Sequence, residues 1–298
     1  MKINISNYNI TLLKQRALAW ANAQSEVLCY LDTNDYQEDK FSKYDCLLAV
    51  GVDQELIVKA AGTAFEQLKK FARINKKWLF GHFNYDLKNE TEDLQSENED
   101  FHCFPELYFF VPTYLCVFHK NKYLEILSSS VAPDEIWNAI QAQVVPLNYD
   151  NASITVQHKI SRQDYLSTIQ KIREHIIEGD VYELNYCQEF YAKKIPIDPL
   201  LLFFKMNKIA RAPFAAYYKL KESYLLCGSP ERFMCKRGNT IISQPIKGTI
   251  RRGITLKEDE QLKLKLHESS KDRSENVMIV DLVRNDLSKS CQTGTIQV

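Results

Sequence analysis

The sequence predicts an α/β (α+β) fold in which mixed or antiparallel sheets pack with helices in two subdomains. Strand-like runs alternate with helix-periodic segments in the first half, and four consecutive β-like runs follow in the second half. The composition of the 298 residues, 45% hydrophobic and 26% charged, is that of a globular chain with a sizeable core. We expect an N-terminal subdomain over residues 1–150 and a second subdomain over residues 151–298.

The first expected element is a helix over residues 11–23, in which Leu12, Leu13, Ala17 and Trp20 recur at helical spacing and can share one face. Strand-like runs then cover three segments and bracket a second helix near residues 62–75. The three strand-like segments are 26–31, 46–52 and 78–87.

Residues 107–118 and 124–127 form two β-rich runs around a polar tip at His119 to Lys122, which predicts an antiparallel hairpin. A mixed sheet is the expected arrangement of the first half. Residues 86–100 contain seven acidic residues and one lysine without apolar periodicity, so we expect an exposed loop there.

The main boundary is expected near residue 150. Ser161, with Asp164 three residues later, predicts the start of a helix that Gly179 ends. The buried stripe expected for this helix consists of Tyr165, Ile169, Ile172 and Ile176.

Asp198 and Pro199 predict a further helix, which runs through Ala210. Helix-favouring charged residues over 256–286 predict two more helices with a break near Ser269. The four β-like runs between them are 214–220, 223–228, 232–237 and 240–244.

Charge and cysteine usage exclude several classes of protein. Thirty-eight basic residues balance 38 acidic ones, so no net field favours nucleic acid or a membrane surface. No apolar stretch reaches the roughly 18 residues that span a bilayer, and the N-terminus lacks the apolar region of a secretory signal. The eight cysteines form no CxxC pair and stand mostly among apolar neighbours, as buried, reduced thiols do. We therefore expect a cytoplasmic protein.

Lys247 stands out in QPIKGTIRRG (244–253), where it lies between β-like residues and a Gly-Thr turn. If it is partly buried, its neutral amine becomes accessible near neutral pH and can act as a nucleophile or a base. An ordinary lysine at the end of a strand is the alternative that the local sequence leaves open.

Two further segments contain carboxylates that are candidate site residues. Glu231 follows a Gly-Ser-Pro turn at the start of a strand, from which it could act as a general acid, or else form a surface salt bridge to Arg232 or Lys236. Asp272 and Glu275 stand three residues apart on one helical face, where their oxygens suit Mg²⁺. Acidic residues near a helix N-terminus are also common for dipole reasons alone.

Together these segments resemble the chorismate-binding enzymes, the family of anthranilate synthase component I, aminodeoxychorismate synthase component I, isochorismate synthase and salicylate synthase. The resemblance covers about residues 155–298, and FGHFNYDLKNETED (80–93) is a weaker similarity in the first half. It implies an anthranilate synthase component I-like fold. The motifs, in the order of the family, are GDVYELNYCQEF (179–190), RAPFAAYY (211–218), GSPERF (228–233), PIKGT (245–249) and KDRSENVMIVDLVRNDL (271–287).

Within the family, Lys before the Gly-Thr pair is typical of aminodeoxychorismate synthases, whereas anthranilate synthases generally carry Ala there. The resemblance therefore implies amination of chorismate at C4 on the route to 4-aminobenzoate and folate. Lys247 would be the nucleophile and Glu231 the general acid, while Gly248 and Thr249 would contact the substrate.

The resemblance further implies that Glu275 holds Mg²⁺, with Asp272 in the neighbouring acidic position. Ammonia would come from a separate glutamine amidotransferase subunit, because nothing in the chain resembles a glutaminase. An anthranilate or isochorismate synthase is the alternative within the family, and a non-catalytic remnant that binds chorismate or the amidotransferase is the alternative outside it.

Members of this family continue beyond the position of Val298 with a substrate-facing histidine, a Gly-rich segment and further glutamate ligands for Mg²⁺. We therefore expect that the chorismate-binding domain is incomplete in residues 1–298, that strand edges stay uncovered, and that this chain alone is poorly stable and inactive.

Overall fold

The computed structural model describes residues 1–95, 98–145 and 154–298. The chain forms two compact units, of which the first combines residues 1–145 with residues 203–298 and the second includes residues 154–202. The boundary expected near residue 150 lies outside the described residues, so the two predicted subdomains remain a prediction.

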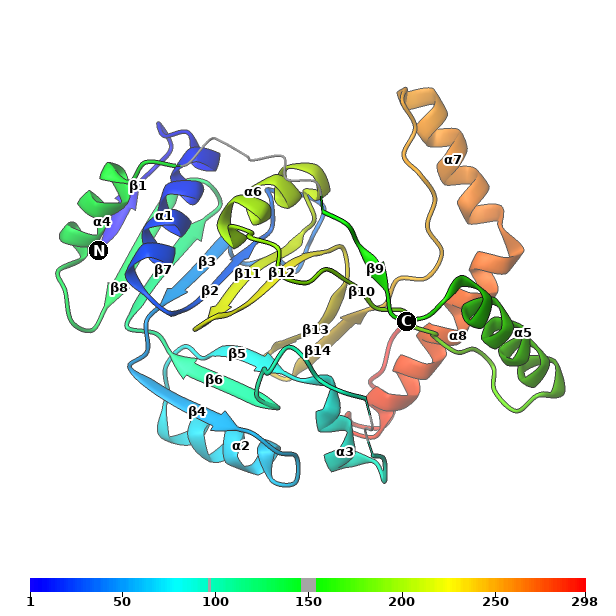
Figure 1. Cartoon of the computed structure of the whole chain (residues 1–298). Coiled ribbons are helices and arrows are strands. Elements are labelled where there is room, and N and C mark those ends of the chain that lie inside the picture. The colour runs from blue at the N-terminus through cyan, green and yellow to red at the C-terminus, as the bar shows by residue number, and fades with distance from the viewer. Residues whose placement is uncertain (96–97, 146–153) are drawn as a thin grey trace. The chain divides into compact units, whose positions relative to one another are not determined.

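A seven-stranded sheet forms the centre of the first unit (Figure 1). Every strand pair that the described residues form in this sheet is antiparallel. The antiparallel form of the prediction is therefore confirmed, and the parallel pairs of a mixed sheet do not occur among these residues. In spatial order the strands are β1 (Lys2–Asn4), β8 (Tyr123–Ser128), β7 (Tyr114–His119), β3 (Cys46–Val50), β2 (Val27–Asp32), β11 (Phe214–Leu220) and β12 (Ser223–Ser229).

Helices α1 (Ile10–Gln24), α4 (Pro133–Ala142) and α6 (Pro199–Ala210) accompany this sheet (Figure 1). The helix predicted over 11–23 is confirmed, and the side chain of Asn9 caps it by accepting a hydrogen bond from the Leu12 amide at 3.0 Å. On its expected apolar face Leu13, Ala17 and Trp20 are buried, whereas Leu12 is exposed.

A three-stranded antiparallel sheet packs on the other face, with the order β4 (Gln54–Val58), β6 (Leu107–Val111), β5 (Phe80–Phe83). The run 107–118, predicted as one β-rich segment, is two strands in two different sheets. Pro112 separates β6 from β7, since proline cannot donate a ladder hydrogen bond. The hairpin predicted around His119 to Lys122 is confirmed as the pair β7–β8.

The acidic segment 86–100, expected as an exposed loop, begins with helical structure. Residues Tyr85–Leu87 form a 3-10 turn and Lys88–Thr91 form the short helix α3. The Glu90 carboxylate accepts hydrogen bonds from backbone amides at the start of α2 (Ala64–Ile74), among them those of Gly62 at 2.8 Å and Ala64 at 2.9 Å. Desolvation alone would raise the pKa of the Glu90 carboxyl, but these donors lower it, so Glu90 serves as a distant N-terminal cap of α2.

His82 joins the two sheets of the first unit. Its Nδ1 lies 3.1 Å from the Tyr218 hydroxyl and its Nε2 lies 3.0 Å from the Pro105 carbonyl oxygen. The carbonyl can only accept, so Nε2 carries the proton and the Tyr218 hydroxyl donates to Nδ1. Desolvation lowers the pKa of His82 below its ordinary value of 6.5, because burial disfavours the imidazolium.

A neutral His82 makes the stability of the first unit depend on pH. The pKa is lower in the folded state, so the stabilisation is fully present above the unfolded value of 6.5 and is lost as the pH falls below it. We expect His82→Phe to cost about 1–3 kcal/mol at pH near 8, because the Tyr218 hydroxyl and the Pro105 carbonyl lose a partner. Urea denaturation at several pH values should show a smaller fall in stability between about pH 7 and 5 for this variant than for the wild type. Equal slopes for the two proteins would rule out this role of His82.

The second unit contains α5 (Arg162–Glu178) and the paired strands β9 (Gln157–His158) and β10 (Phe190–Tyr191). The predicted ends of α5 are confirmed: the Ser161 hydroxyl accepts from the Asp164 amide at 3.1 Å, and Gly179 has a φ of 85°.

The stripe expected to be buried on α5 is not. Tyr165, Ile169 and Ile172 are half-buried and Ile176 is exposed, and no residue of this helix is buried. The helix forms as predicted, but among residues 154–202 the only sheet is the short pair β9–β10, which is too small to cover a helix of this length.

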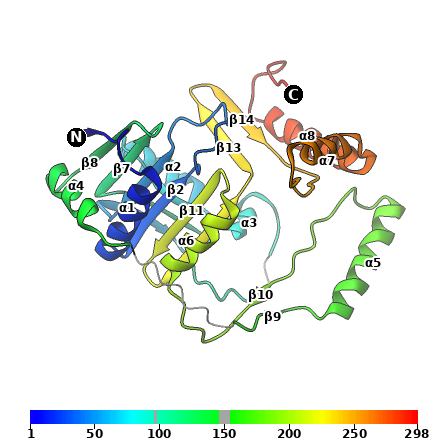
Figure 2. The same ribbon diagram turned by 90° about the horizontal axis from the view of Figure 1, so that it is seen from above.

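The remaining elements follow β12 in the first unit. Strands β13 (Arg232–Arg237) and β14 (Thr240–Gln244) form an antiparallel hairpin, which leads to helix α7 (Leu256–Glu268) and then to α8 (Ser270–Ser288) (Figures 1 and 2). The β-like runs predicted between residues 214 and 244 and the helix break near Ser269 are confirmed.

The described helices include none with the length and the apolar character that crossing a bilayer requires. All eight cysteines are free thiols, of which Cys29, Cys46 and Cys116 are buried. Cys103 and Cys187 are exposed, so the expectation of burial is wrong for these two.

Candidate active site

The open end of the β13–β14 hairpin holds the predicted general acid. Arg232 and Gln244 are paired across the hairpin, so Glu231 and Pro245 leave it side by side. The Glu231 carboxylate accepts a hydrogen bond from the Ile246 amide at 3.0 Å. The Glu231 amide in turn donates to the Ser229 hydroxyl at 3.1 Å. The exposed Glu231 carboxylate is thus fixed beside the residue that precedes Lys247.

Lys247 is half-buried, which is the condition that the sequence analysis set for a reactive lysine. It makes at least one interaction within the protein. Gly248 follows with a φ of 76°, a conformation that side chains with a β-carbon rarely adopt. A β-carbon at this position would lie 2.8 Å from both the β-carbon and Oδ1 of Asp272. Glycine therefore allows the PIKGT segment to pack directly against the first turn of α8.

We expect Gly248→Ala to cost about 2–3 kcal/mol or more in the free energy of unfolding, because left-handed strain and a clash with Asp272 add. Gly238 in the β13–β14 turn is a matched control, since its φ is also positive, at 55°, but nothing lies within 4 Å of an added β-carbon. Gly238→Ala should cost only about 1–2 kcal/mol. Urea titrations of both variants test the difference, and equal costs would show that Gly248 and Asp272 are not in close contact.

Thr249 is exposed and lines a groove of about 690 Å³ together with residues of α7 and the first turn of α8, including Asp272. The loop behind it is held by the start of α7. Arg252 makes a bidentate ion pair with Asp259, and the Asp259 carboxylate also accepts from the Gly253 amide at 2.7 Å. These donors lower the pKa of Asp259 to about 2, so the loop stays anchored at any pH near neutrality.

The predicted metal ligands lie one turn apart on α8. The Ser269 hydroxyl donates to the Asp272 carboxylate and accepts from the Asp272 amide, so Asp272 also belongs to the N-terminal cap of the helix. The Glu275 carboxylate is one-third exposed and lies 3.6 Å from the Lys271 ammonium. Two carboxylates at this spacing fit Mg²⁺, which usually takes one or two protein carboxylates and keeps several waters.

The structure thus brings all six predicted residues into one region of the first unit. Glu231 contacts the residue before Lys247, Gly248 contacts Asp272, and Thr249 and Asp272 line the same groove. Glu275 follows one turn later on the same helix. The roles assigned to these residues remain predictions.

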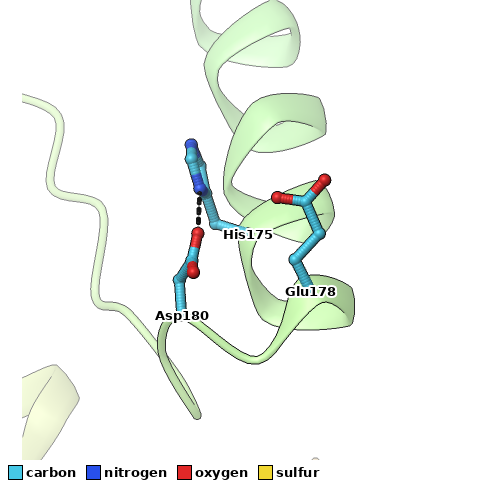
Figure 3. A group of neighbouring side chains, drawn as sticks. All are labelled: His175, Glu178 and Asp180. Carbon is cyan, nitrogen blue, oxygen red and sulfur yellow. Dashed lines mark hydrogen bonds and ion pairs between the residues drawn. The ribbon is translucent and has the colours of Figure 1, made fainter.

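Another group of possible metal ligands lies in the second unit. One ligand atom each of His175, Glu178 and Asp180 lie within 4.8 Å of one another (Figure 3). All three residues are exposed, and His175 Nδ1 is already hydrogen-bonded to Asp180 at 2.7 Å. That hydrogen bond raises the pKa of His175, which favours the protonated ring that cannot bind a metal through this nitrogen. We assign no metal to this cluster.

Two residues near the site were missed by sequence reasoning. Arg232 was expected only as a possible surface partner of Glu231, but its ion-pair partner in the structure is Asp39. The two side chains are 11% and 9% exposed, so the pair is almost buried. No local signal could show this pairing, because Asp39 is separated from Arg232 by 193 positions.

The fold and these motifs define the class of protein. A family model described as chorismate binding enzyme matches residues 22–298, and the chain therefore belongs to the chorismate-binding enzymes.

Particular relatives refine this picture. Aminodeoxychorismate synthase component 1 of Escherichia coli (strain K12) is 33% identical over 220 residues, which cover 73% of this chain and 48% of that protein. The probable chloroplastic aminodeoxychorismate synthase of Oryza sativa subsp. japonica is 42% identical over 141 residues, which cover 46% of this chain and 16% of that protein. The chain thus spans less than half the length of these curated relatives.

Solved structures confirm the predicted fold class. Anthranilate synthase component I from Streptococcus pneumoniae TIGR4 superimposes with a TM-score of 0.68 at 17% sequence identity, over 85% of this chain and 63% of that chain. At this identity the likeness shows the fold alone, which is the anthranilate synthase component I-like fold that the motifs implied.

Proposed function

We propose that this chain aminates chorismate at C4 to form 4-amino-4-deoxychorismate, the precursor of 4-aminobenzoate in folate synthesis. The observation that carries the proposal is the open end of the β13–β14 hairpin, where the Glu231 carboxylate is bound to the amide next to Lys247. A nucleophilic amine and a proton donor on adjacent backbone segments are what a displacement with a poor leaving group requires. The similarity to aminodeoxychorismate synthases supports this branch of the family.

In the first step the amine nitrogen of Lys247 attacks ring C2 of chorismate. The C2–N bond forms, the ring double bonds shift, and the C4–O bond breaks. Glu231 donates its proton to the departing hydroxyl, which leaves as water, and the new ammonium group loses a proton. A covalent lysine adduct replaces one difficult displacement by two easier ones.

In the second step ammonia attacks C4, the double bonds shift back, and the C2–N bond breaks. The nitrogen that was ammonia loses a proton and the departing Lys247 nitrogen takes one up, so Lys247 leaves as the free amine and 4-amino-4-deoxychorismate is released. The nitrogen thereby enters at the carbon from which the hydroxyl left. Gly248 lets this segment pack against Asp272 and would contact the substrate through its backbone only. The exposed Thr249 offers its hydroxyl for a hydrogen bond to the ring substituents.

We further propose that Glu275 and Asp272 hold Mg²⁺. When bound, this ion would neutralise the C1 carboxylate of chorismate and draw electron density from the ring. Glu275 would provide a direct oxygen ligand, since its ion pair with the exposed Lys271 is long, at 3.6 Å. Asp272 is already bound to Ser269, so it would act through a water molecule.

Ammonia would come from a glutamine amidotransferase partner, and the reaction would take place in the cytoplasm. The free state of all eight cysteines supports a reducing compartment.

Anthranilate synthesis is the second candidate, because the chain is also 29% identical over 226 residues to the anthranilate synthase component 1 of Saccharolobus solfataricus. Both reactions start from chorismate, but they deliver nitrogen to different ring carbons. Lys247 favours the C4 reaction, since a covalent lysine at C2 blocks that carbon and directs ammonia elsewhere.

The test is to incubate the protein with chorismate, Mg²⁺ and an ammonium salt and to separate the products by chromatography. We run it on residues 1–298 and on the same chain supplied with the remaining portion of the Escherichia coli relative as a separate polypeptide. Formation of 4-amino-4-deoxychorismate in either mixture supports the proposal. Anthranilate or isochorismate as the product would contradict it.

A further inference from the structure

The ion pair between Asp39 and Arg232 lies next to the proposed general acid and has no part in the mechanism above. Arg232 is the first residue of β13 and directly follows Glu231 in the chain. Its guanidinium binds the Asp39 carboxylate, its Nε donates to the Gln244 side chain at 2.9 Å, and its Cζ lies 4.9 Å from the centre of the Phe214 ring. Residues from three separate segments of the chain thus hold one side chain.

Burial makes this arrangement rigid. The Arg232 and Asp39 side chains are 11% and 9% exposed, and both line a cavity of about 650 Å³. An arginine in this position offers a planar fork that matches a carboxylate and stacks on an aromatic ring at the same time. Removing one partner leaves a buried charge without compensation.

The fixed side chain determines where β13 begins. The pair Arg232–Gln244 is the last one of the hairpin before Glu231, and the ladder is irregular between Arg232 and Cys235. Regular backbone pairing is therefore interrupted directly after Arg232, which keeps a single ladder pair with Gln244. The side-chain contacts of Arg232 add to that pair.

We propose that Arg232, held by Asp39, is the positioning residue that sets the Glu231 carboxylate against the Ile246 amide and so beside Lys247. The pair connects the 39–41 segment of the N-terminal half to the catalytic hairpin, and the Arg237 guanidinium adds a second connection by donating to the Phe41 carbonyl. The catalytic consequence of this inference rests on the proposed function, whereas the positioning of Glu231 by Arg232 does not.

The experiment measures hydrogen exchange at the Ile246 amide by NMR in the whole chain, which requires no turnover. Glu231→Ala removes the acceptor and should lower the protection of this amide about five- to tenfold, as the loss of one hydrogen bond does. The double variant Asp39→Asn/Arg232→Gln, which removes both charges together, should lower it by a similar factor. Combining the double variant with Glu231→Ala should give no further loss, because the pair acts through Glu231.

Two controls keep the result specific. Glu38→Gln removes an exposed negative charge next to Asp39 and should leave the Ile246 amide unchanged. The amide of Leu48, at the centre of the large sheet, reports whether the fold is intact. If the double variant does not fold, Arg232→Lys replaces it, since lysine keeps the charge but cannot contact Asp39, Gln244 and Phe214 together.

The proposal would be overturned if the Ile246 amide kept its wild-type protection in the double variant or in Arg232→Lys while the Leu48 amide stayed protected. It would also be overturned if the loss of protection in the double variant simply added to the loss in Glu231→Ala.

In the amination assay the same variants should lower kcat about tenfold or more with KM for chorismate within about twofold, as expected when a general acid is displaced. If the wild type makes no 4-amino-4-deoxychorismate in either mixture of the amination assay, only the proposed function is contradicted, because hydrogen exchange would still decide whether the pair positions Glu231.

Discussion

Replacing Lys247 by alanine should abolish the amination of chorismate. Loss of a covalent nucleophile removes both steps of the reaction, so we expect a decrease of at least about 10³-fold in kcat/KM. Lys247→Arg should be equally inactive although it keeps the positive charge, because a guanidinium stays protonated and cannot attack C2. Chromatographic measurement of 4-amino-4-deoxychorismate with ammonium as the nitrogen donor checks both variants.

The control for this prediction is Lys257→Ala, which removes an exposed lysine from the first turn of α7 and should leave activity unchanged. Chorismate binding by the Lys247 variants, followed by calorimetry, should persist within about tenfold, since one contact of several is lost. Turnover by Lys247→Ala at the wild-type rate would exclude the covalent route. Arginine restoring the activity would point to a purely electrostatic role.

Glu231→Gln should lower kcat about 10²- to 10⁴-fold, the range that general acid catalysis contributes. Glutamine keeps an oxygen acceptor for the Ile246 amide, so the backbone beside Lys247 should stay in place and KM for chorismate should change little. The effect can then be assigned to the missing proton rather than to a displaced loop.

Glu222→Gln, an exposed substitution in the β11–β12 turn, serves as the control for Glu231→Gln and should leave the rate unchanged. A Glu231→Gln enzyme with the wild-type rate would show that another group protonates the leaving hydroxyl.

Much of the secondary structure could be predicted from the sequence, because the signals were local. Ser161 and Gly179 marked the ends of α5, and Ser269 marked the break between α7 and α8, since caps depend on only a few neighbouring residues. The six candidate site residues came from short motifs, and the structure gathers them into one region.

What could not be predicted depends on partners far away in the sequence. The apolar character of residues 107–118 predicts one unit, although Pro112 divides them between two sheets. The local sequence places Glu90 in a solvated loop, because its partners, the amides at the start of α2, lie at least 25 positions away. The Asp39–Arg232 pair was invisible for the same reason.

Burial was the least predictable property. The apolar stripe of α5 has the right spacing for a core helix, yet the described part of its own unit contains too few elements to cover it. Periodicity shows which face of a helix is apolar, but it does not show what that face packs against.

Trapping the lysine adduct tests the central claim most directly. Chorismate and Mg²⁺ are added without any ammonia, the reaction is stopped with acid, and peptides are analysed by mass spectrometry. We predict that the peptide containing Lys247 gains the mass of one chorismate less one water, and that Lys247→Arg and Glu231→Gln abolish or strongly reduce this gain. A protein that forms 4-amino-4-deoxychorismate when ammonium is present, but never shows this adduct in its absence, would contradict the account.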